Sequence, residues 1–178
     1  AQRAEIKEGS RVLIAGAGPI GVIMAQVARA FGATEVIITD IAKDRREFAL
    51  GYGATKALDP KVDKVEGLGV DAFVDASGVA DAVYSGIKAV GPAGHALLVG
   101  LGSEDMTLPV SHIQNNEIWV TGVFRYRNTW PTGIELVASG KVNLDVLVTH
   151  KFGLDQVEEA LNAGKLPGSM KIIVQPNN

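Results

Sequence analysis

The chain of 178 residues contains no cysteine, which excludes disulfides and thiolate metal sites within it. It also lacks a basic excess, since 17 Lys and Arg against 20 Asp and Glu give a net charge of -3. A nucleic-acid-binding face is usually basic, so we expect no nucleic-acid partner. The sequence shows no apolar run of 18 residues and no charged-then-apolar leader, so we expect neither a membrane span nor secretion. These absences favour a cytoplasmic protein without a membrane partner.

Glycine, by contrast, is abundant, with 21 residues, and three of them form one motif. The run from Val12 to Ala15 is short and apolar, as is typical of a strand in the middle of a parallel sheet. Gly16 allows a tight turn after it, Gly18 lets the backbone approach a pyrophosphate, and Gly21 lets the next helix pack closely on the strand. This spacing in this context predicts a dinucleotide-binding loop.

The residues after the loop have the pattern of an amphipathic helix. Pro19 suits the first position of a helix, where an N–H would have no partner. The apolar residues then recur every three or four positions, which puts one face on the sheet: Ile20, Ile23, Met24, Val27, Ala28 and Phe31. The free N–H groups and positive dipole end of this helix would point at the bound phosphates.

Asp40 completes the motif, 19 residues after Gly21 and at the end of a second apolar run. A carboxylate there accepts hydrogen bonds from both ribose hydroxyls and repels a 2′-phosphate, so the sequence predicts NAD rather than NADP. The alternative is that Asp40 only caps the helix beginning near Lys43. Arg45 and Arg46 keep NADP open, because a basic group nearby would tolerate a phosphate.

Strands and helices continue to alternate as far as Phe124, which predicts an α/β fold: a doubly wound, parallel, six-stranded sheet of the Rossmann type. We expect one NAD-binding domain over 1–178, with its core at about 11–124 and a C-terminal extension at 125–178. That extension should hold helices at 131–139 and 154–163 and a final strand at 171–174. The other expected strands lie at 55–58, 70–75, 96–99 and 119–124. We further expect helices at 43–52 and 81–89 and a turn at 91–94. Residues 61–69 are compatible with either a helix or a loop.

Three segments together resemble the sorbitol (polyol) dehydrogenases of the zinc-containing medium-chain dehydrogenase/reductase superfamily. They are Gly-Ala-Gly-Pro-Ile-Gly at 16–21, Val-Gly-Leu-Gly-Ser-Glu at 99–104, and Gly-Val-Phe-Arg-Tyr-Arg-Asn-Thr-Trp at 122–130; Leu-Val-Thr-His-Lys-Phe at 147–152 adds to them. The resemblance covers the chain from about Val12 to Val174. The glycine loop alone would fit any member of that superfamily.

The resemblance implies roles for particular residues. Ile20 would lie beside the cofactor diphosphate, Asp40 on the adenosine ribose and Arg45 near the adenosine end. Val99, Gly100 and Leu101 would flank the nicotinamide, and Phe124, Arg125 and Tyr126 would close over it, with Arg125 and Tyr126 also reaching the polyol substrate. Each has a structural alternative: Val99 as core, Arg125 as a solvated charge, and Tyr126 as aromatic packing under a loop. For Ala76-Ser77-Gly78, contact with the cofactor is an open question.

Members of this family carry an additional GroES-like domain, mostly before the nucleotide domain, which holds the catalytic zinc. We find no counterpart of it in this sequence and therefore expect the chain by itself to bind NAD(H) without catalysis. His95, His112 and His150 have no ligand-like spacing, so none is expected to bind metal. In the intact enzyme, zinc would act as a Lewis acid while hydride passes from a secondary alcohol to NAD.

Two other functions stay open. One is a stand-alone nucleotide-binding or assembly module, since the resemblance implies homo-oligomers and the apolar run at 119–124 suits an edge strand. The other is an S-adenosylmethionine-dependent methyltransferase. Such enzymes usually have an acidic residue directly before the glycine loop, where this chain has Ala15, and Pro19 also suits the dinucleotide form better.

Overall fold

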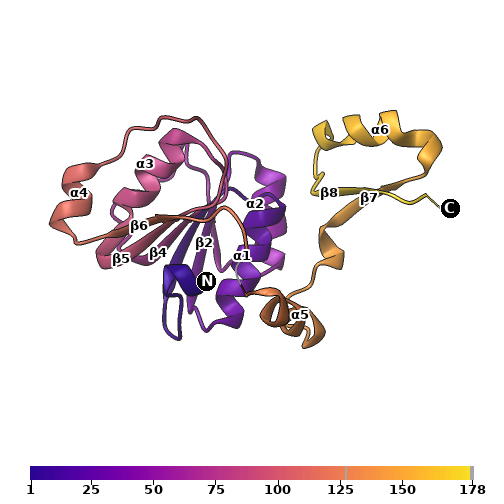
Figure 1. Ribbon diagram of the computed structural model, residues 1–178. Helices are drawn as coiled ribbons and strands as arrows, with labels where there is room; N and C mark the ends of the chain where they lie inside the picture. The colour runs from indigo at the N-terminus through magenta and orange to yellow at the C-terminus, as the bar shows by residue number, and fades with distance from the viewer. Residues whose placement is uncertain (127, 177–178) are drawn as a thin grey trace. The chain divides into compact units, whose positions relative to one another are not determined.

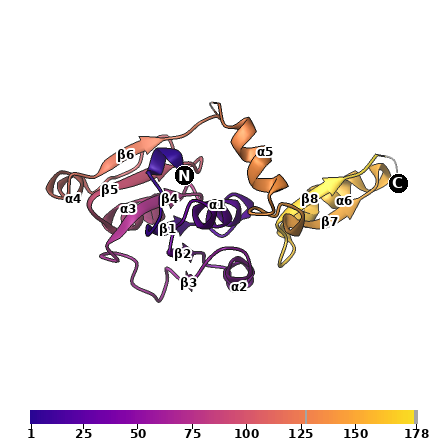
Figure 2. The same cartoon turned by 90° about the horizontal axis from the view of Figure 1, so that it is seen from below.

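The computed structural model describes residues 1–126 and 128–176 and divides the chain into two units, Ala1–Val142 and Asn143–Asn178. The first unit contains a six-stranded parallel sheet in the order β3-β2-β1-β4-β5-β6 (Figures 1 and 2). This order confirms the doubly wound fold that the alternating pattern predicts. The strands are β1 (Arg11–Ala15), β2 (Glu35–Thr39), β3 (Lys56–Leu58), β4 (Val70–Asp75), β5 (Val90–Leu98) and β6 (Trp119–Gly122).

The two faces of the sheet are covered by different helices. Helices α1 (Pro19–Ala30) and α2 (Lys43–Gly51) lie on one side, and α3 (Ala80–Lys88) lies on the other (Figure 1). Alternation along the strands supplies both faces, so that Leu13 and Phe73, which are register partners, enter the same core as Ile87 of α3. Gly86 allows this packing, because a Cβ there would lie 2.1 Å from the Phe73 ring. Two further helices complete the unit, α4 (Val110–Asn115) and α5 (Trp130–Ala138), with a short 3-10 helix η1 (Gln2–Ala4).

The expected turn at 91–94 is wrong as a strand boundary. Strand β5 already begins at Val90, which pairs with Val70, and its register with β4 shifts before His95 pairs with Ala72. Residues 91–94 therefore form an irregularity within the strand, with Ala93 at φ 57°. The Gly-Pro-Ala-Gly segment distorts the strand locally, but β5 pairs with β4 both before it, at Val90, and after it, from His95 onward. The open segment 61–69 contains neither helix nor strand.

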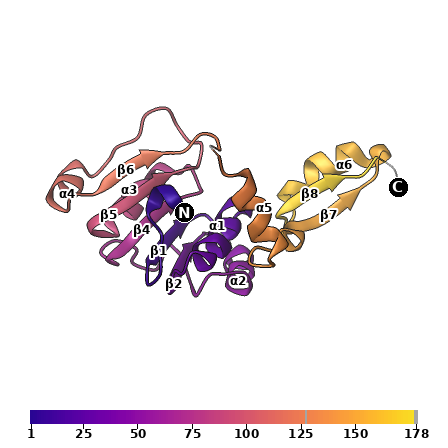
Figure 3. The same cartoon turned by 60° about the horizontal axis from the view of Figure 1, so that its bottom comes forward.

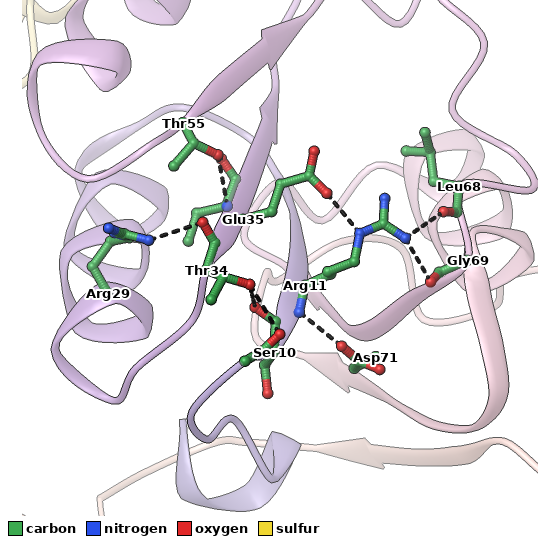
Figure 4. Close-up of polar contacts among 11 residues, drawn as sticks. Ser10, Arg11, Arg29, Thr34, Glu35, Thr55, Leu68, Gly69 and Asp71 are labelled. Carbon is green, nitrogen blue, oxygen red and sulfur yellow. Dashed lines mark hydrogen bonds and ion pairs between the residues drawn. The ribbon is translucent and has the colours of Figure 1, made fainter.

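The amino ends of β1, β2 and β4 are joined by Arg11 (Figure 4). Its Nε donates to Glu35 Oε2 at 2.7 Å, and its Nη1 donates to the carbonyl oxygens of Leu68 (3.1 Å) and Gly69 (3.0 Å). The Arg11 backbone N–H donates to Asp71 Oδ2 at 2.7 Å. These polar residues fix the edge of the sheet opposite the strand ends at which ligands of open α/β sheets bind.

The second unit is a small two-stranded parallel sheet, β7 (Val148–Phe152) with β8 (Lys171–Val174), and α6 (Val157–Asn162) packs against both strands (Figure 3). The strand expected at 171–174 is confirmed as β8. The helix expected at 154–163 is confirmed in its extent, but it is α-helical only in the middle, since the 3-10 helices η3 (Leu154–Gln156) and η4 (Ala163–Lys165) flank α6. A further 3-10 helix, η2 (Asp145–Leu147), precedes β7. Across 1–126 and 128–176, no helix has the length and apolar character needed to cross a membrane.

Candidate functional site

Three loops meet where β1, β4 and β5 end, at the carboxyl edge of the sheet. The loop after β1 touches the loop after β4, since a Cβ on Gly16 would lie 3.1 Å from the Ala76 carbonyl oxygen. The loop after β4 touches the loop after β5, since a Cβ on Gly78 would lie 2.4 Å from the Leu101 carbonyl oxygen. The sheet order reverses between β1 and β4, and this is where open α/β sheets bind ligands.

The glycine loop has the geometry that its spacing predicts. Gly16 adopts φ 95°, and its N–H donates to the Thr39 carbonyl oxygen at 2.8 Å. A Cβ on Gly21 would lie only 1.8 Å from the Gly16 carbonyl oxygen, so the first turn of α1 presses directly on the loop. Gly18 differs, because a Cβ there would meet nothing within 4 Å. The space beside Gly18 is therefore open at the position where a diphosphate would approach.

Helix α1 begins at this open space. Gly18 is its N-cap and Pro19 its first residue, and no side chain caps the exposed N–H groups of the first turn. A twelve-residue helix with an uncapped amino end presents donors and a positive dipole end to an anion. Ile20, in the same turn, is 53% exposed, so the expected apolar face of this helix is wrong in part. The face that packs on the sheet is turned from it, and the buried residues of α1 are Gly21, Val22, Ala25, Gln26 and Ala28.

Asp40 lies directly after β2 and fastens the glycine loop. Its Oδ2 accepts the Ala17 N–H at 2.9 Å, and its Oδ1 accepts the Ala42 N–H at 2.8 Å. Ala42 is the N-cap residue of α2, and no side chain caps that helix, so the alternative that Asp40 only caps it is wrong. Each carboxylate oxygen keeps a further lone pair for a ligand hydroxyl, so the loop contacts and a ribose contact are compatible.

The two arginines that left NADP open are placed differently. Arg46 Nη1 donates to the Asp40 carbonyl oxygen at 2.6 Å and forms an ion pair with Asp59 Oδ2 at 3.1 Å. That guanidinium is therefore engaged within the protein. Arg45 is half-buried on the same helix and is the basic residue that the resemblance assigns to the adenosine end.

Val99 and Gly100 are anchored by Asp75, a residue that the sequence reasoning did not single out. The Asp75 carbonyl oxygen accepts the N–H groups of Val99 and Gly100, each at 3.0 Å. The Asp75 side chain is 1% exposed, and its Oδ1 accepts Ser77 N–H (2.9 Å), Ser77 Oγ–H (2.7 Å) and Gly78 N–H (3.1 Å). The signal was available in the sequence: an acidic residue ending an apolar strand directly before Ala-Ser-Gly.

Phe124, Arg125 and Tyr126 follow β6 and are all exposed. The Arg125 guanidinium carbon lies 4.7 Å from the centroid of the Phe124 ring, and Tyr126 packs edge-on against Trp130 at 4.9 Å. Because Tyr126 and Trp130 are 64% and 62% exposed, they do not pack under a loop, and that alternative is wrong. Arg127, in the same segment, lies outside the described residues.

The carboxyl edge as a whole is unusually apolar. Each of the strands β1, β2, β4, β5 and β6 is followed within a few residues by a large apolar side chain that is more than half exposed: Ile20, Ile41, Val79, Leu101 and Phe124. Exposed apolar groups gathered beside a few polar ones are typical of a ligand-binding surface. Two other surface hollows exist, one lined by Tyr84, Lys88 and 108–112 and one along the amino edge at 4–10 and 92–95, and neither contains these loops.

No group of three or more potential metal ligands occurs among residues 1–126 and 128–176. The histidines are occupied elsewhere: His95 with Glu5, His112 with the Val90 carbonyl oxygen and Asn116, and His150 with Thr149. Lys88 Nζ donates a hydrogen bond to Glu66 Oε2 at 2.6 Å, which raises the pKa of Lys88, so this lysine stays protonated and is no general base. The side chains of the described residues therefore do not fit a zinc ion.

Comparison with known proteins gives a consistent picture. The family model described as "Zinc-binding dehydrogenase" matches residues 19–139. Sorbitol dehydrogenase from sheep (Ovis aries) is 36% identical over 98% of this chain and 52% of its own length, and that from Macaca fascicularis is 39% identical over 99% and 53%. The chain therefore spans about half the length of the curated relatives that it matches.

Solved structures of similar proteins agree with the sequence matches. The 2R,3R-butanediol dehydrogenase of Bacillus subtilis superposes with a TM-score of 0.91 at 28% identity, over 99% of this chain and 53% of that one. A zinc-binding dehydrogenase from Sinorhizobium meliloti 1021, bound to NADP, superposes with a TM-score of 0.90 at 28% identity, over 97% and 54%. Both structures share the fold of this chain over nearly its whole length.

Proposed function

Because this chain belongs to the zinc-binding dehydrogenase family, we propose that it is the part of such an enzyme that binds NAD(H). One observation carries the proposal: the Gly16–Gly21 loop, the uncapped start of α1 and Asp40 lie together where the sheet order reverses. The diphosphate would receive N–H groups from α1, and the adenosine ribose would donate its hydroxyls to Asp40. Arg45 would lie toward the adenosine end.

The proposed cofactor is NAD rather than NADP. A 2′-phosphate beside Asp40 would be repelled, and Arg46 is engaged by Asp59 and by the Asp40 carbonyl oxygen. The relative from Sinorhizobium meliloti is bound to NADP in its solved structure, so the preference is not uniform among similar structures. Asp40 and the engaged Arg46 are the features of this chain that favour NAD.

For the intact enzyme we propose oxidation of a secondary alcohol in a small polyol by hydride transfer to the nicotinamide. The residues of this chain would contribute the cofactor and one side of the substrate pocket. Val99, Gly100 and Leu101 would flank the nicotinamide, Phe124 would cover it, and Arg125 and Tyr126 would donate hydrogen bonds to substrate hydroxyls. A zinc ion bound by another part of the intact enzyme would polarise the alcohol oxygen as a Lewis acid.

The remaining parts of the chain also have proposed roles. The second unit exposes Leu154, Leu161 and Leu166, and we assign segment 125–178 to contact with the zinc-bearing domain. A cytoplasmic location stays a prediction from composition.

We expect this chain alone to bind NADH and to show negligible polyol oxidation. NADH fluorescence titration measures the first, and absorbance at the NADH band with sorbitol, NAD and added zinc measures the second. Binding without turnover supports the proposal, because the cofactor half of the site is present while no zinc ligands occur among the described residues. Robust polyol oxidation by this chain would show that it is more than the cofactor-binding part of an enzyme and would overturn that assignment. Absence of NADH binding would overturn the proposed function itself.

A second role as an assembly module is favoured by β6. This strand ends the sheet order, so one of its edges is unpaired within the described sheet, and Trp119 is 70% exposed beside it. We propose that β6 pairs with β6 of a second copy to form a homodimer. Size-exclusion chromatography with light scattering should give twice the mass of the 18.7 kDa chain, and a strict monomer at all concentrations would contradict the pairing.

A further inference from the structure

The loops after β4 and β5 are held together by one buried carboxylate. Asp75 is the last residue of β4, and its side chain accepts hydrogen bonds from the loop that follows it, through Ser77 and Gly78. Its backbone carbonyl oxygen accepts both N–H groups at the start of the loop after β5, those of Val99 and Gly100. A single residue therefore joins loop 76–78 to loop 99–102.

The two loops are packed so closely that their relative position depends on this joint. A Cβ on Gly100 would lie 2.2 Å from the Gly78 nitrogen and 2.7 Å from Asp75 Oδ2. A Cβ on Gly102 would lie 2.0 Å from the Gly78 carbonyl oxygen. Backbone lies on backbone here with no side chain between, so a small movement of loop 76–78 is passed directly to loop 99–102.

Burying a carboxylate is unfavourable in free energy unless hydrogen bonds compensate for the lost water. An ionised group with 1% exposure must have its hydrogen-bonding capacity satisfied within the protein, and here the donors come from the loop itself. Two loop residues, Ser77 and Gly78, thus supply all four of these hydrogen bonds, and no basic side chain takes part in them.

We propose that Asp75 is a positioning residue for the nicotinamide half of the cofactor. This inference rests on the proposed function, which places the nicotinamide at Val99, Gly100 and Leu101. The adenosine half depends on a separate joint, since Asp40 fastens the glycine loop through Ala17 and makes no contact with loop 99–102 in the hydrogen bonds described. Changing Asp75 therefore acts on one half of the dinucleotide.

The test compares NADH with AMP, which carries only the adenosine half. Asp75→Asn keeps the shape of the side chain but turns one oxygen into an NH2 group that faces the Ser77 or Gly78 donors. We expect the Kd for NADH to rise about ten-fold and the Kd for AMP to change less than about two-fold, as suits the loss of hydrogen bonds to a charged group. NADH is followed by its fluorescence, and AMP by calorimetry.

Two further variants separate positioning from general stability. Asp71→Asn makes the same change on the same strand at the opposite edge and should alter neither Kd. Ser77→Ala removes the 2.7 Å hydrogen bond to Asp75 and also the acceptor of the Val79 N–H at 3.2 Å, while the Asp75 carboxylate stays in place. It should shift the NADH Kd in the same direction as Asp75→Asn by a smaller factor, and it carries the test if Asp75→Asn does not fold.

The possible failures are distinguishable. Parallel losses of NADH and AMP, or unchanged affinity for both, in Asp75→Asn or Ser77→Ala would overturn the positioning role while leaving the cofactor site intact. A wild-type chain that binds neither NADH nor AMP would instead remove the proposed function itself.

Discussion

Replacing Gly21 by alanine is expected to abolish NADH binding and to lower the free energy of unfolding. The new Cβ would lie 1.8 Å from the Gly16 carbonyl oxygen and 2.9 Å from its carbonyl carbon, and both are backbone atoms that cannot rotate away. Helix α1 would have to move off the loop, which costs at least about 2 kcal/mol by comparison with overpacked cores. Denaturant unfolding and NADH fluorescence titration measure the two effects.

Gly18→Ala is the matched variant, because it makes the same chemical change in the same loop. A Cβ at Gly18 meets nothing within 4 Å, and the residue has an ordinary φ of -74°. Stability should therefore stay within about 0.5 kcal/mol of the wild type. NADH affinity should nevertheless fall, since the methyl group would occupy the space assigned to the diphosphate. A Gly18→Ala chain that binds NADH as tightly as the wild type would place the diphosphate elsewhere.

Replacing Asp40 by alanine should weaken NADH binding by at least about ten-fold and narrow the preference for NADH over NADPH. The change removes an acceptor for the ribose hydroxyls and the charge that repels a 2′-phosphate, and hydrogen bonds to a charged group contribute roughly 1.5–3 kcal/mol. It also releases the Ala17 and Ala42 N–H groups, so some of the loss belongs to the loop. Parallel titrations with NADH and NADPH measure the preference.

Asp40→Asn separates the two contributions. The amide keeps the size of the side chain and one acceptor, but it has no charge to repel the 2′-phosphate of NADPH. We expect the preference for NADH over NADPH to narrow in this variant even if the glycine loop keeps its conformation. Equal losses for NADH and NADPH in both variants would mean that Asp40 acts only on the loop and not on the ribose.

Much of this site could be predicted because its features are local in the sequence. Strand, glycine turn and helix start follow one another within residues 11–30. Glycine is required at Gly16 because its φ is 95°, and at Gly21 because the Gly16 carbonyl oxygen leaves no space for a Cβ. Periodicity of the apolar residues likewise predicted the parallel sheet, because strands buried on both faces read as continuous apolar runs. Family membership followed from a few longer motifs.

What could not be predicted depends on contacts between distant segments. The role of Asp75 arises from loop 76–78 meeting loop 99–102, and the engagement of Arg46 arises from Asp59, which directly follows β3. The irregular start of β5 is of the same kind, because the strand pairs at Val90 before residues 91–94 leave the ladder. The helix expected at 154–163 has the observed extent, but its two ends are 3-10 helix, a distinction that apolar spacing does not predict.

The central claim is that the three loops at the carboxyl edge of the sheet form one dinucleotide site. It is tested most directly by titrating NADH into the isotopically labelled chain and following the backbone amide resonances by NMR. The account predicts shifts at residues 16–21, 40–42, 76–78 and 99–101, with the amino edge around Arg11 and the hollow beside Lys88 unaffected. Shifts confined to the amino edge or to that hollow, or no shifts at saturating NADH, would contradict it.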